Sequence, residues 1–220
     1  MKFPMKCRYI IISSLMAFIS CNTAAPSNKN LDTAQENNNT AKEYEDLLIK
    51  KEDAKQIMGY DTLGQFIATI DFEVKAAKED LESFEDGIVP WISLEESEKE
   101  IQRLIKPDEI VLAYKNVTLI IDYPLNNPVS FEITTTTNGF SRKQLIREIS
   151  KKYHEIYKEE EVSASTKTIP RGERKGIINR NETDGKYGIW GHDLSDLDLS
   201  SVEVYKKSGG KIYLNPGVVS

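Results

Sequence analysis

Residues 179–194 read NRNETDGKYGIWGHDL, and the chain is organised around this segment. It contains one of the two tryptophans, one of the two histidines and three glycines. Because glycine tolerates positive φ angles and close approach of another backbone, three glycines beside aromatic and titratable residues predict a turn of fixed geometry. Such a turn either presents side chains to a ligand or serves the fold alone. The first alternative gives as candidate ligand-binding residues Asn179, Arg180, Tyr187, Trp190, His192 and Asp193.

The chemistry open to this segment depends on His192. Its neighbour Asp193 points away from it in an extended backbone, so the two residues are not a ready-made dyad. Acid–base catalysis of the hydrolase kind would need a carboxylate from elsewhere, and with His192 the candidate catalytic residues are Glu159 and Glu160. The following aspartates lack the glycine and distal glutamate of a calcium loop, so we predict no metal and no cofactor. We favour a ligand- or protein-binding module over an enzyme or a purely structural envelope role.

A helix is predicted upstream of the segment, beginning at Ser141. Ser141 and Gln144 match a capping box, and Phe140 and Leu145 are spaced as a hydrophobic staple. Its buried face is expected to hold Ile146, Ile149, Tyr153, Ile156 and Tyr157, with His154 on the solvent flank. The helix ends in three glutamates, residues 159–161, where the helix dipole disfavours negative charge. We therefore expect fraying there; the alternative is that these carboxylates serve a site.

Strand-like and loop-like stretches flank this helix. Residues 110–115, 117–123 and 129–136 read as strands, and the turn composition PLNNP at 124–128 predicts that the last two form an antiparallel hairpin. Residues 162–176 are polar and basic, which predicts a mobile loop and a possible lid. A second hairpin is predicted at the end of the chain, with strands at 201–207 and 211–214.

Helical periodicity dominates residues 43–106. Helices are predicted at 44–58, at 62–84 and from Ser93 to Pro107. The second rests on apolar residues three and four apart and on a capping box at its start. It is either a partner-binding coiled coil or a helix packed on its own domain, and the lack of clear charge pairing favours the latter.

These patterns together predict the α+β fold class. We expect an antiparallel sheet with packed helices at 107–220, preceded by the helical region at 43–106. A single domain covering 43–220 is the alternative.

The N-terminus carries a specific motif. Residues 1–8 hold three positive charges and no negative one, and the apolar run at 9–19 is too short for a permanent span. The run ends in FISC at 18–21, which resembles the lipobox of bacterial lipoproteins. The resemblance implies a signal peptide at 1–20 and diacylation of Cys21, the lipid attachment site. It also implies an anchor in the cell envelope, with the outer membrane as the expected location. An ordinary secretory signal with an incidental cysteine is the alternative.

Composition narrows the possible partners. Without residues 1–20 the chain has 26 basic and 35 acidic residues, a formal charge of −9. This argues against nucleic acid or anionic lipid headgroups as partners of the folded part, and leaves an unidentified protein or small molecule. Cys7 leaves with the signal and Cys21 carries lipid, so no thiol remains for a disulfide or a zinc site. Residues 21–42 have little to bury and predict a flexible tether.

Four motifs between residues 87 and 194 carry a further resemblance. They read GIVPW at 87–91, IDYPL at 121–125, YHEIY at 153–157 and YGIWGHDL at 187–194. Together they resemble a family that occurs in varied organisms and has no established activity. No functional residue follows from this resemblance. It implies that the lipid anchor is not an essential part of the module but a targeting feature added to it.

Overall fold

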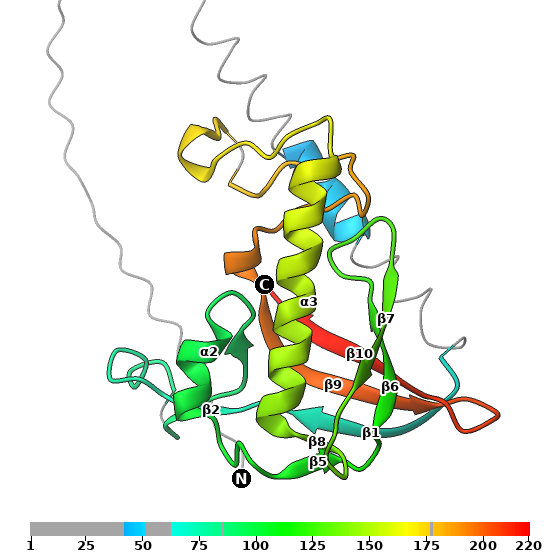
Figure 1. The fold of residues 1–220 in the computed structure, drawn as a ribbon. Helices are drawn as coiled ribbons and strands as arrows, with labels where there is room; N and C mark the ends of the chain where they lie inside the picture. The colour runs from blue at the N-terminus through cyan, green and yellow to red at the C-terminus, as the bar shows by residue number, and fades with distance from the viewer. Residues whose placement is uncertain (1–41, 52–62, 85, 177) are drawn as a thin grey trace, which may run out of the picture.

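The computed structural model describes residues 42–51, 63–84, 86–176 and 178–220 (Figure 1). The predicted signal peptide and Cys21 lie outside the described residues, as does the predicted tether apart from Lys42. The predicted helix at 44–58 is described only to residue 51, and residues 42–51 are helical.

The described residues form a sheet of six strands. Its main path runs in the order β1 (Gln65–Asp71), β9 (Asp198–Lys206), β10 (Ile212–Val219), β6 (Asn116–Ile121) and β7 (Val129–Thr134). The sixth strand, β4 (Ile92–Ser93), pairs with the beginning of β9. Neighbouring strands are antiparallel except β10 and β6, which are parallel. The predicted antiparallel sheet is therefore a mixed one: after β7 the chain passes through a helix and β9, and β10 then lies parallel beside β6.

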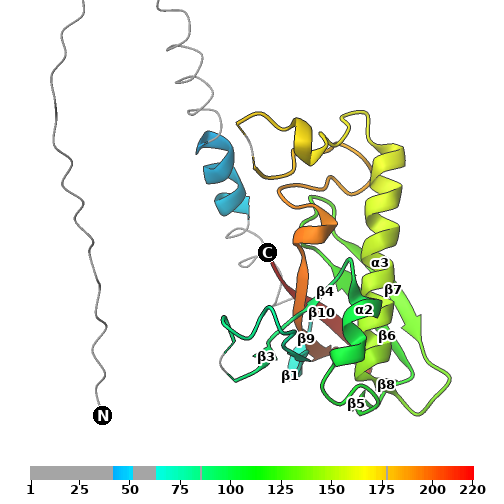
Figure 2. The same ribbon diagram turned by 90° about the vertical axis from the view of Figure 1, so that its left-hand side faces the viewer.

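One long helix packs along a face of this sheet (Figures 1 and 2). Helix α3 (Arg142–Ser163) follows the short strand β8 (Phe140–Ser141). The predicted capping box is confirmed: Gln144 N donates to Ser141 Oγ, and Ser141 N donates to the Gln144 side chain. Its apolar stripe is buried against the sheet, through Leu145, Ile146, Ile149, Tyr153 and Ile156. His154 is exposed, as predicted.

Short elements complete the described structure. They are β2 (Val74–Lys75), β3 (Ile88–Val89), α2 (Ser97–Glu100), β5 (Ile110–Leu112) and three 3-10 turns, η2 (Ile101–Arg103), η3 (Arg171–Glu173) and η4 (Leu194–Asp196). The helix predicted from Ser93 is thus confined to α2 and η2, since Ser93 belongs to strand β4. Both predicted hairpins are confirmed, as β6 with β7 and β9 with β10.

The helix predicted at 62–84 is not formed. Residues 65–71 are the strand β1, and turns follow β2 at residues 78–83. Apolar residues in this stretch fit a helical spacing, but Gln65 to Asp71 pair along β9 instead, and Ile70 enters the shared core. Because β1 and β4 belong to the same sheet as the C-terminal strands, one sheet crosses the predicted boundary between 106 and 107.

The fold class is α+β, with helix and sheet elements in one core. Within the described residues, no helix has both the length and the apolar character needed to cross a membrane.

Candidate functional site

The carboxylate of Glu160 organises the segment that the sequence singles out. Glu160 lies in the last turn of α3 and is completely buried. It accepts hydrogen bonds from Thr183 Oγ1 at 2.7 Å and from three backbone N–H groups, of Gly185 at 2.9 Å, Tyr187 at 2.8 Å and Gly188 at 3.2 Å. The predicted fraying is wrong at Glu160, because the loop returns donors to this carboxylate and offsets the unfavourable helix dipole.

The electrostatics of Glu160 follow from these contacts. Burial raises the pKa of its carboxyl, but the hydrogen bonds from Thr183 and from the three backbone N–H groups lower it more strongly. The net pKa lies below the ordinary value, so Glu160 is charged and serves as an acceptor, not as a proton donor.

Glycines are required where the loop meets this carboxylate. A Cβ at position 185 would lie 2.7 Å from the Glu160 carboxylate, and Gly188 has a φ of 64° that side chains disfavour. The turn predicted from the glycine spacing is therefore confirmed, and its purpose is close approach to a buried anion.

The second candidate glutamate, Glu159, contacts the same loop from outside. Its carboxylate accepts from Tyr187 Oη and from Lys186 Nζ, both at 2.6 Å. Tyr187 itself is buried, with 3% of its surface exposed. The structure thus uses both candidate glutamates to hold the loop around Tyr187.

The aromatic residues of the segment lie in the interior. Trp190 has no exposed surface and packs edge-on against Tyr123, with ring centroids 5.3 Å apart. The His192 ring is half-buried and lies 5.6 Å from the ring of Tyr123. Tyr157 donates a hydrogen bond of 2.9 Å to the His192 carbonyl oxygen. The structure therefore places His192 in an aromatic cluster, while the two glutamates contact the loop at 183–188. The candidate Trp190 is a core residue and does not present a binding surface.

Asp193 and Arg180 belong to an ionic network. Asp193 contacts Arg174 at 2.8 Å and Arg171 at 3.3 Å. Burial raises the pKa of the Asp193 carboxyl, but the two guanidinium groups lower this pKa more strongly. Arg180 is 3% exposed and donates to Ile189 O at 3.0 Å and, at 2.6 Å, to a threonine hydroxyl in the preceding loop. Asn179 is half-buried beside it.

The loop predicted to be mobile at residues 162–176 begins only at residue 164, because α3 extends to Ser163, and the loop takes part in this network. Arg174 Nε donates to Ile169 O at 2.9 Å, and the Asn181 side chain accepts from Ile169 N at 2.7 Å. Asp184 accepts from Thr166 N at 2.6 Å. The loop is thereby hydrogen-bonded to the segment that it precedes.

The helix at 42–51 packs on the other side of the segment, as Figure 2 shows. Tyr44 Oη donates to Arg180 O at 2.5 Å, and Lys51 Nζ lies 2.6 Å from the Glu182 carboxylate. Leu48 is buried and would meet a Cβ placed at Gly191 at 3.3 Å. The segment is thus enclosed by α3, the 162–176 loop and this helix, and most of its polar groups bond to the protein itself.

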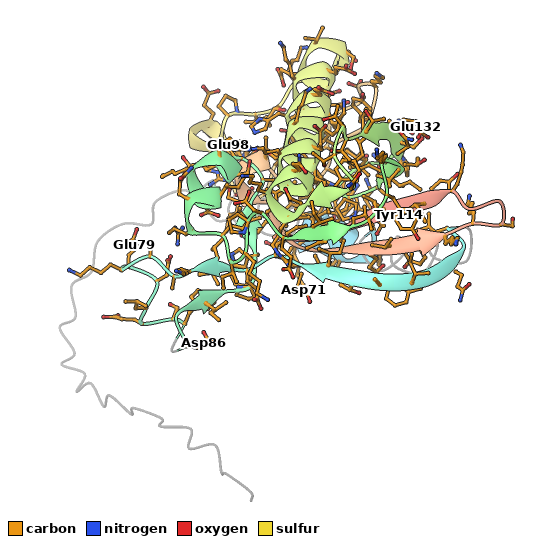
Figure 3. All side chains as sticks on the ribbon, turned by 60° about the horizontal axis from the view of Figure 1, so that its bottom comes forward. Asp71, Glu79, Asp86, Glu98, Tyr114 and Glu132 are labelled. Carbon is orange, nitrogen blue, oxygen red and sulfur yellow. The ribbon has the colours of Figure 1, made fainter. Side chains whose placement is uncertain are left out.

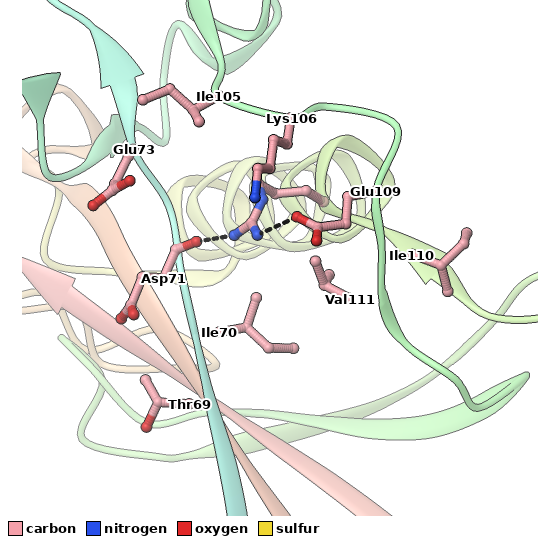
Figure 4. Close-up of a pocket in the computed structure, with 10 residues that line it drawn as sticks. Thr69, Ile70, Asp71, Glu73, Ile105, Lys106, Glu109, Ile110 and Val111 are labelled. Carbon is pink, nitrogen blue, oxygen red and sulfur yellow. Dashed lines mark hydrogen bonds and ion pairs between the residues drawn. The ribbon is translucent and has the colours of Figure 1, made fainter.

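A groove at the margin of the sheet has a different character. It has a volume of about 490 Å³ and lies between β1 and residues 105–111 (Figure 4). Asp71, labelled in Figure 3, lies at the end of β1 beside it. The remaining lining residues are Thr69, Ile70, Glu73, Ile105, Lys106, Glu109, Ile110, Val111 and Arg142.

Arg142 is the central side chain of this groove. Its guanidinium donates to the Asp71 carbonyl oxygen and, at 3.0 Å, to the Glu109 carboxylate. Its Nε is buried and has no hydrogen-bond partner among the described residues. A buried donor without a partner is costly, so the packing around this guanidinium leaves one of its donors unsatisfied.

Local sequence explains how Arg142 reaches the groove. It is the first residue of α3, and its backbone N–H donates to Glu109 O at 3.0 Å, which holds the 107–109 turn against the helix start. Arg142 is not among the candidate residues predicted from the sequence. A signal was available, because a cation at a helix N-terminus opposes the helix dipole, and the first turn of α3 holds no acidic residue.

The site residues offer no conventional metal centre. Within the described ranges, no group of three or more histidine, cysteine, aspartate or glutamate residues is arranged to hold a metal ion. Comparisons with protein-family models, with curated proteins and with solved structures found no match to this chain.

Proposed function

We propose that the protein is an exported lipoprotein of the bacterial cell envelope whose folded part is a ligand- or protein-binding module. The groove between β1 and residues 105–111 is the proposed binding site. The observation that carries this proposal is Arg142, a cation that lines an open groove and joins its two walls through Asp71 O and the Glu109 carboxylate.

The anchor part of the proposal is supported by the sequence alone. Residues 18–21 resemble a lipobox after a basic and apolar leader, and they imply acylation of Cys21. Several acyl chains, at about 0.8 kcal/mol per buried methylene, would hold the protein at the membrane permanently. The outer membrane is the proposed location.

The anchor is tested in cells by Cys21→Ala. We expect the variant protein to leave the membrane fraction or to accumulate unprocessed, while wild-type protein partitions into detergent. Cys7→Ala is the matched control, because Cys7 precedes the cleavage site and should change neither processing nor partitioning. Unchanged detergent partitioning of the Cys21→Ala protein would refute the anchor.

The groove favours polar ligands with an acceptor for Arg142. Glu109 pairs with the guanidinium, and Ile70 and Val111 supply an apolar part. The charged residues Asp71, Glu73 and Lys106 also line the groove. This mixture suits a peptide or a small zwitterionic molecule better than a polyanion, which agrees with the acidic composition of the chain.

Arg142→Gln tests the groove directly. The variant retains a polar side chain but loses the guanidinium, so we expect any ligand found by screening the full-length protein to bind at least about tenfold more weakly. Lys143→Gln is the matched control, because Lys143 is the adjacent cation and pairs with Asp108. Equal affinities for wild type and Arg142→Gln would exclude the groove as the binding site.

A further inference from the structure

Strand β1 forms one margin of the sheet. It pairs with β9 on one side, and the strand order places no strand of the described residues on its other side. Phe72 N donates to Ser200 O, so the backbone groups of residues 70 and 72 face β9. Backbone groups alternate in direction along an antiparallel strand, which turns those of Thr69 and Asp71 outward, toward the groove.

The chain itself begins to pair with this outer edge and then stops. Val74 and Leu104 form an antiparallel bridge, and Ile105 N donates to Glu73 O at 2.9 Å. Lys106 then adopts a φ of 51° and Pro107 follows, so the backbone turns away and forms the opposite wall of the groove. The edge is therefore paired at residues 73–74, Asp71 O accepts from Arg142, and the backbone groups of Thr69 are open toward the groove.

The open part of β1 has features that natural edge strands usually avoid. Residues 65–70 carry no charge, and every residue from 65 to 69 is exposed. Phe66 is 51% exposed and Ile67 is 40% exposed. An uncharged and exposed edge invites pairing with another strand, and a register shift between Phe66 and Ala68 protects only its first part.

We infer that the groove binds an extended polypeptide segment of another protein, which adds to the outer edge of β1 as an antiparallel strand. The guest continues the pairing that residues 104–105 begin and occupies the place from which Lys106 and Pro107 divert the chain. The N–H and C=O of Thr69 and the N–H of Asp71 supply the pairing, as in other cases of strand addition, while Asp71 O remains bonded to Arg142. This inference rests on the proposed function, because it names the ligand class of the same groove.

Charges in the groove select the guest further. Glu109 is engaged by Arg142, while the carboxylates of Asp71 and Glu73 also line the groove. A lysine or arginine side chain of the guest fits these carboxylates, and Lys106, which also lines the groove, suits a carbonyl oxygen of the guest. The expected ligand is therefore an extended, basic and otherwise apolar peptide segment.

The test uses full-length acylated protein in detergent and a synthetic library of seven-residue peptides with a central lysine, with binding read by fluorescence anisotropy. For the best peptide, each amide is then N-methylated in turn. Strand addition uses every second peptide N–H, so N-methylation should weaken binding about five- to tenfold at alternate positions and leave the positions between unchanged. Loss without alternation, or no binding by any peptide, would overturn the inference.

Variants on the protein side separate this inference from the proposed function. Thr69→Pro removes an outward N–H and should weaken the same peptide, whereas Thr69→Ala keeps that N–H and should bind as wild type. If Arg142→Gln weakens binding but N-methylation shows no alternation, the groove is the site and strand addition is wrong. If the protein instead forms dimers through β1, shown by light scattering and loss of the dimer in Thr69→Pro, a second copy is the occupant and the peptide inference fails.

Discussion

Backbone N–H groups are bonded inside the protein in the segment at 183–193, whereas at the outer edge of β1 they face a groove. In the segment, three backbone N–H donors within four residues converge on one buried carboxylate, Glu160, and the side chains of Tyr187 and Trp190 are buried. At β1, the outward groups of residues 69–71 border an open groove. The stretch that is most distinctive in the sequence is therefore not the stretch that is available for binding. The segment with the glycines and the tryptophan stabilises the fold, whereas the less distinctive strand β1 offers a binding surface.

The largest effect is expected from Trp190→Ala, inside the segment. The side chain is completely buried, so its removal leaves a cavity and should lower the free energy of unfolding by about 3–5 kcal/mol. Trp91→Ala is the control, because Trp91 is only half-buried and packs on Phe84. Urea unfolding of both variants measures the difference. If Trp190→Ala is as stable as Trp91→Ala, the segment does not stabilise the fold.

A smaller effect is expected when Glu160 loses its charge. Glu160→Gln keeps the shape of the side chain but places an NH2 group against the backbone N–H donors. The free energy of unfolding should therefore fall by about 2–3 kcal/mol. Glu159→Gln should cost much less stability than Glu160→Gln, because the Glu159 side chain is 51% exposed. Thermal melting compares the two neighbours. Equal losses of stability in the two variants would mean that the buried carboxylate of Glu160 stabilises the fold no more than the exposed carboxylate of Glu159.

Features fixed by near neighbours could be predicted from the sequence. The start of α3 depends on Ser141 and Gln144, three residues apart, and the β6–β7 hairpin depends on alternation around one turn. Both were predicted correctly, because the interactions that decide them lie within a few residues.

Features fixed by distant partners could not be predicted. The apolar spacing at 63–74 fits a helix, but β9, more than a hundred residues later, provides the pairing that makes β1 a strand. Fraying at Glu160 was expected from the helix dipole alone, since its donors arrive from residues 183–188. Arg142 gained its role from Asp71 and Glu109, neither of which is near it in sequence.

The start of β9, where the segment passes into the sheet, predicts a pH dependence. Burial, and secondly the charge of Glu100, raise the pKa of Asp198 to about 6. The folded state then binds this proton more tightly than the unfolded state does. Stability from Asp198 is therefore present below the unfolded pKa, about 4, and is lost as the pH rises through the folded pKa.

Asp198→Asn should remove this dependence. The variant should match the wild type near pH 4 and exceed its stability by roughly 1–2 kcal/mol near pH 7, a figure discounted because water screens a partly exposed carboxylate. Urea unfolding across this range is the measurement. Glu100→Gln should move the wild-type transition to lower pH, since it removes the second cause. A stability difference that does not vary with pH would contradict the assignment.

The smallest effect is expected at the open edge itself. Ile67 is 40% exposed, so Ile67→Thr should change the free energy of unfolding by no more than about 0.5 kcal/mol. Ile70 is the matched position three residues on, and it is 6% exposed and part of the core. Ile70→Thr should therefore cost about 2 kcal/mol or more, because it removes buried methyl contacts and buries a hydroxyl. The denaturant midpoints of Ile67→Thr and Ile70→Thr are the measurement. They decide whether the buried side chains of β1 stabilise the fold while its exposed side chains do not. A large loss from Ile67→Thr would mean that the exposed residues of β1 already serve the fold, and the contrast with the 183–193 segment would disappear.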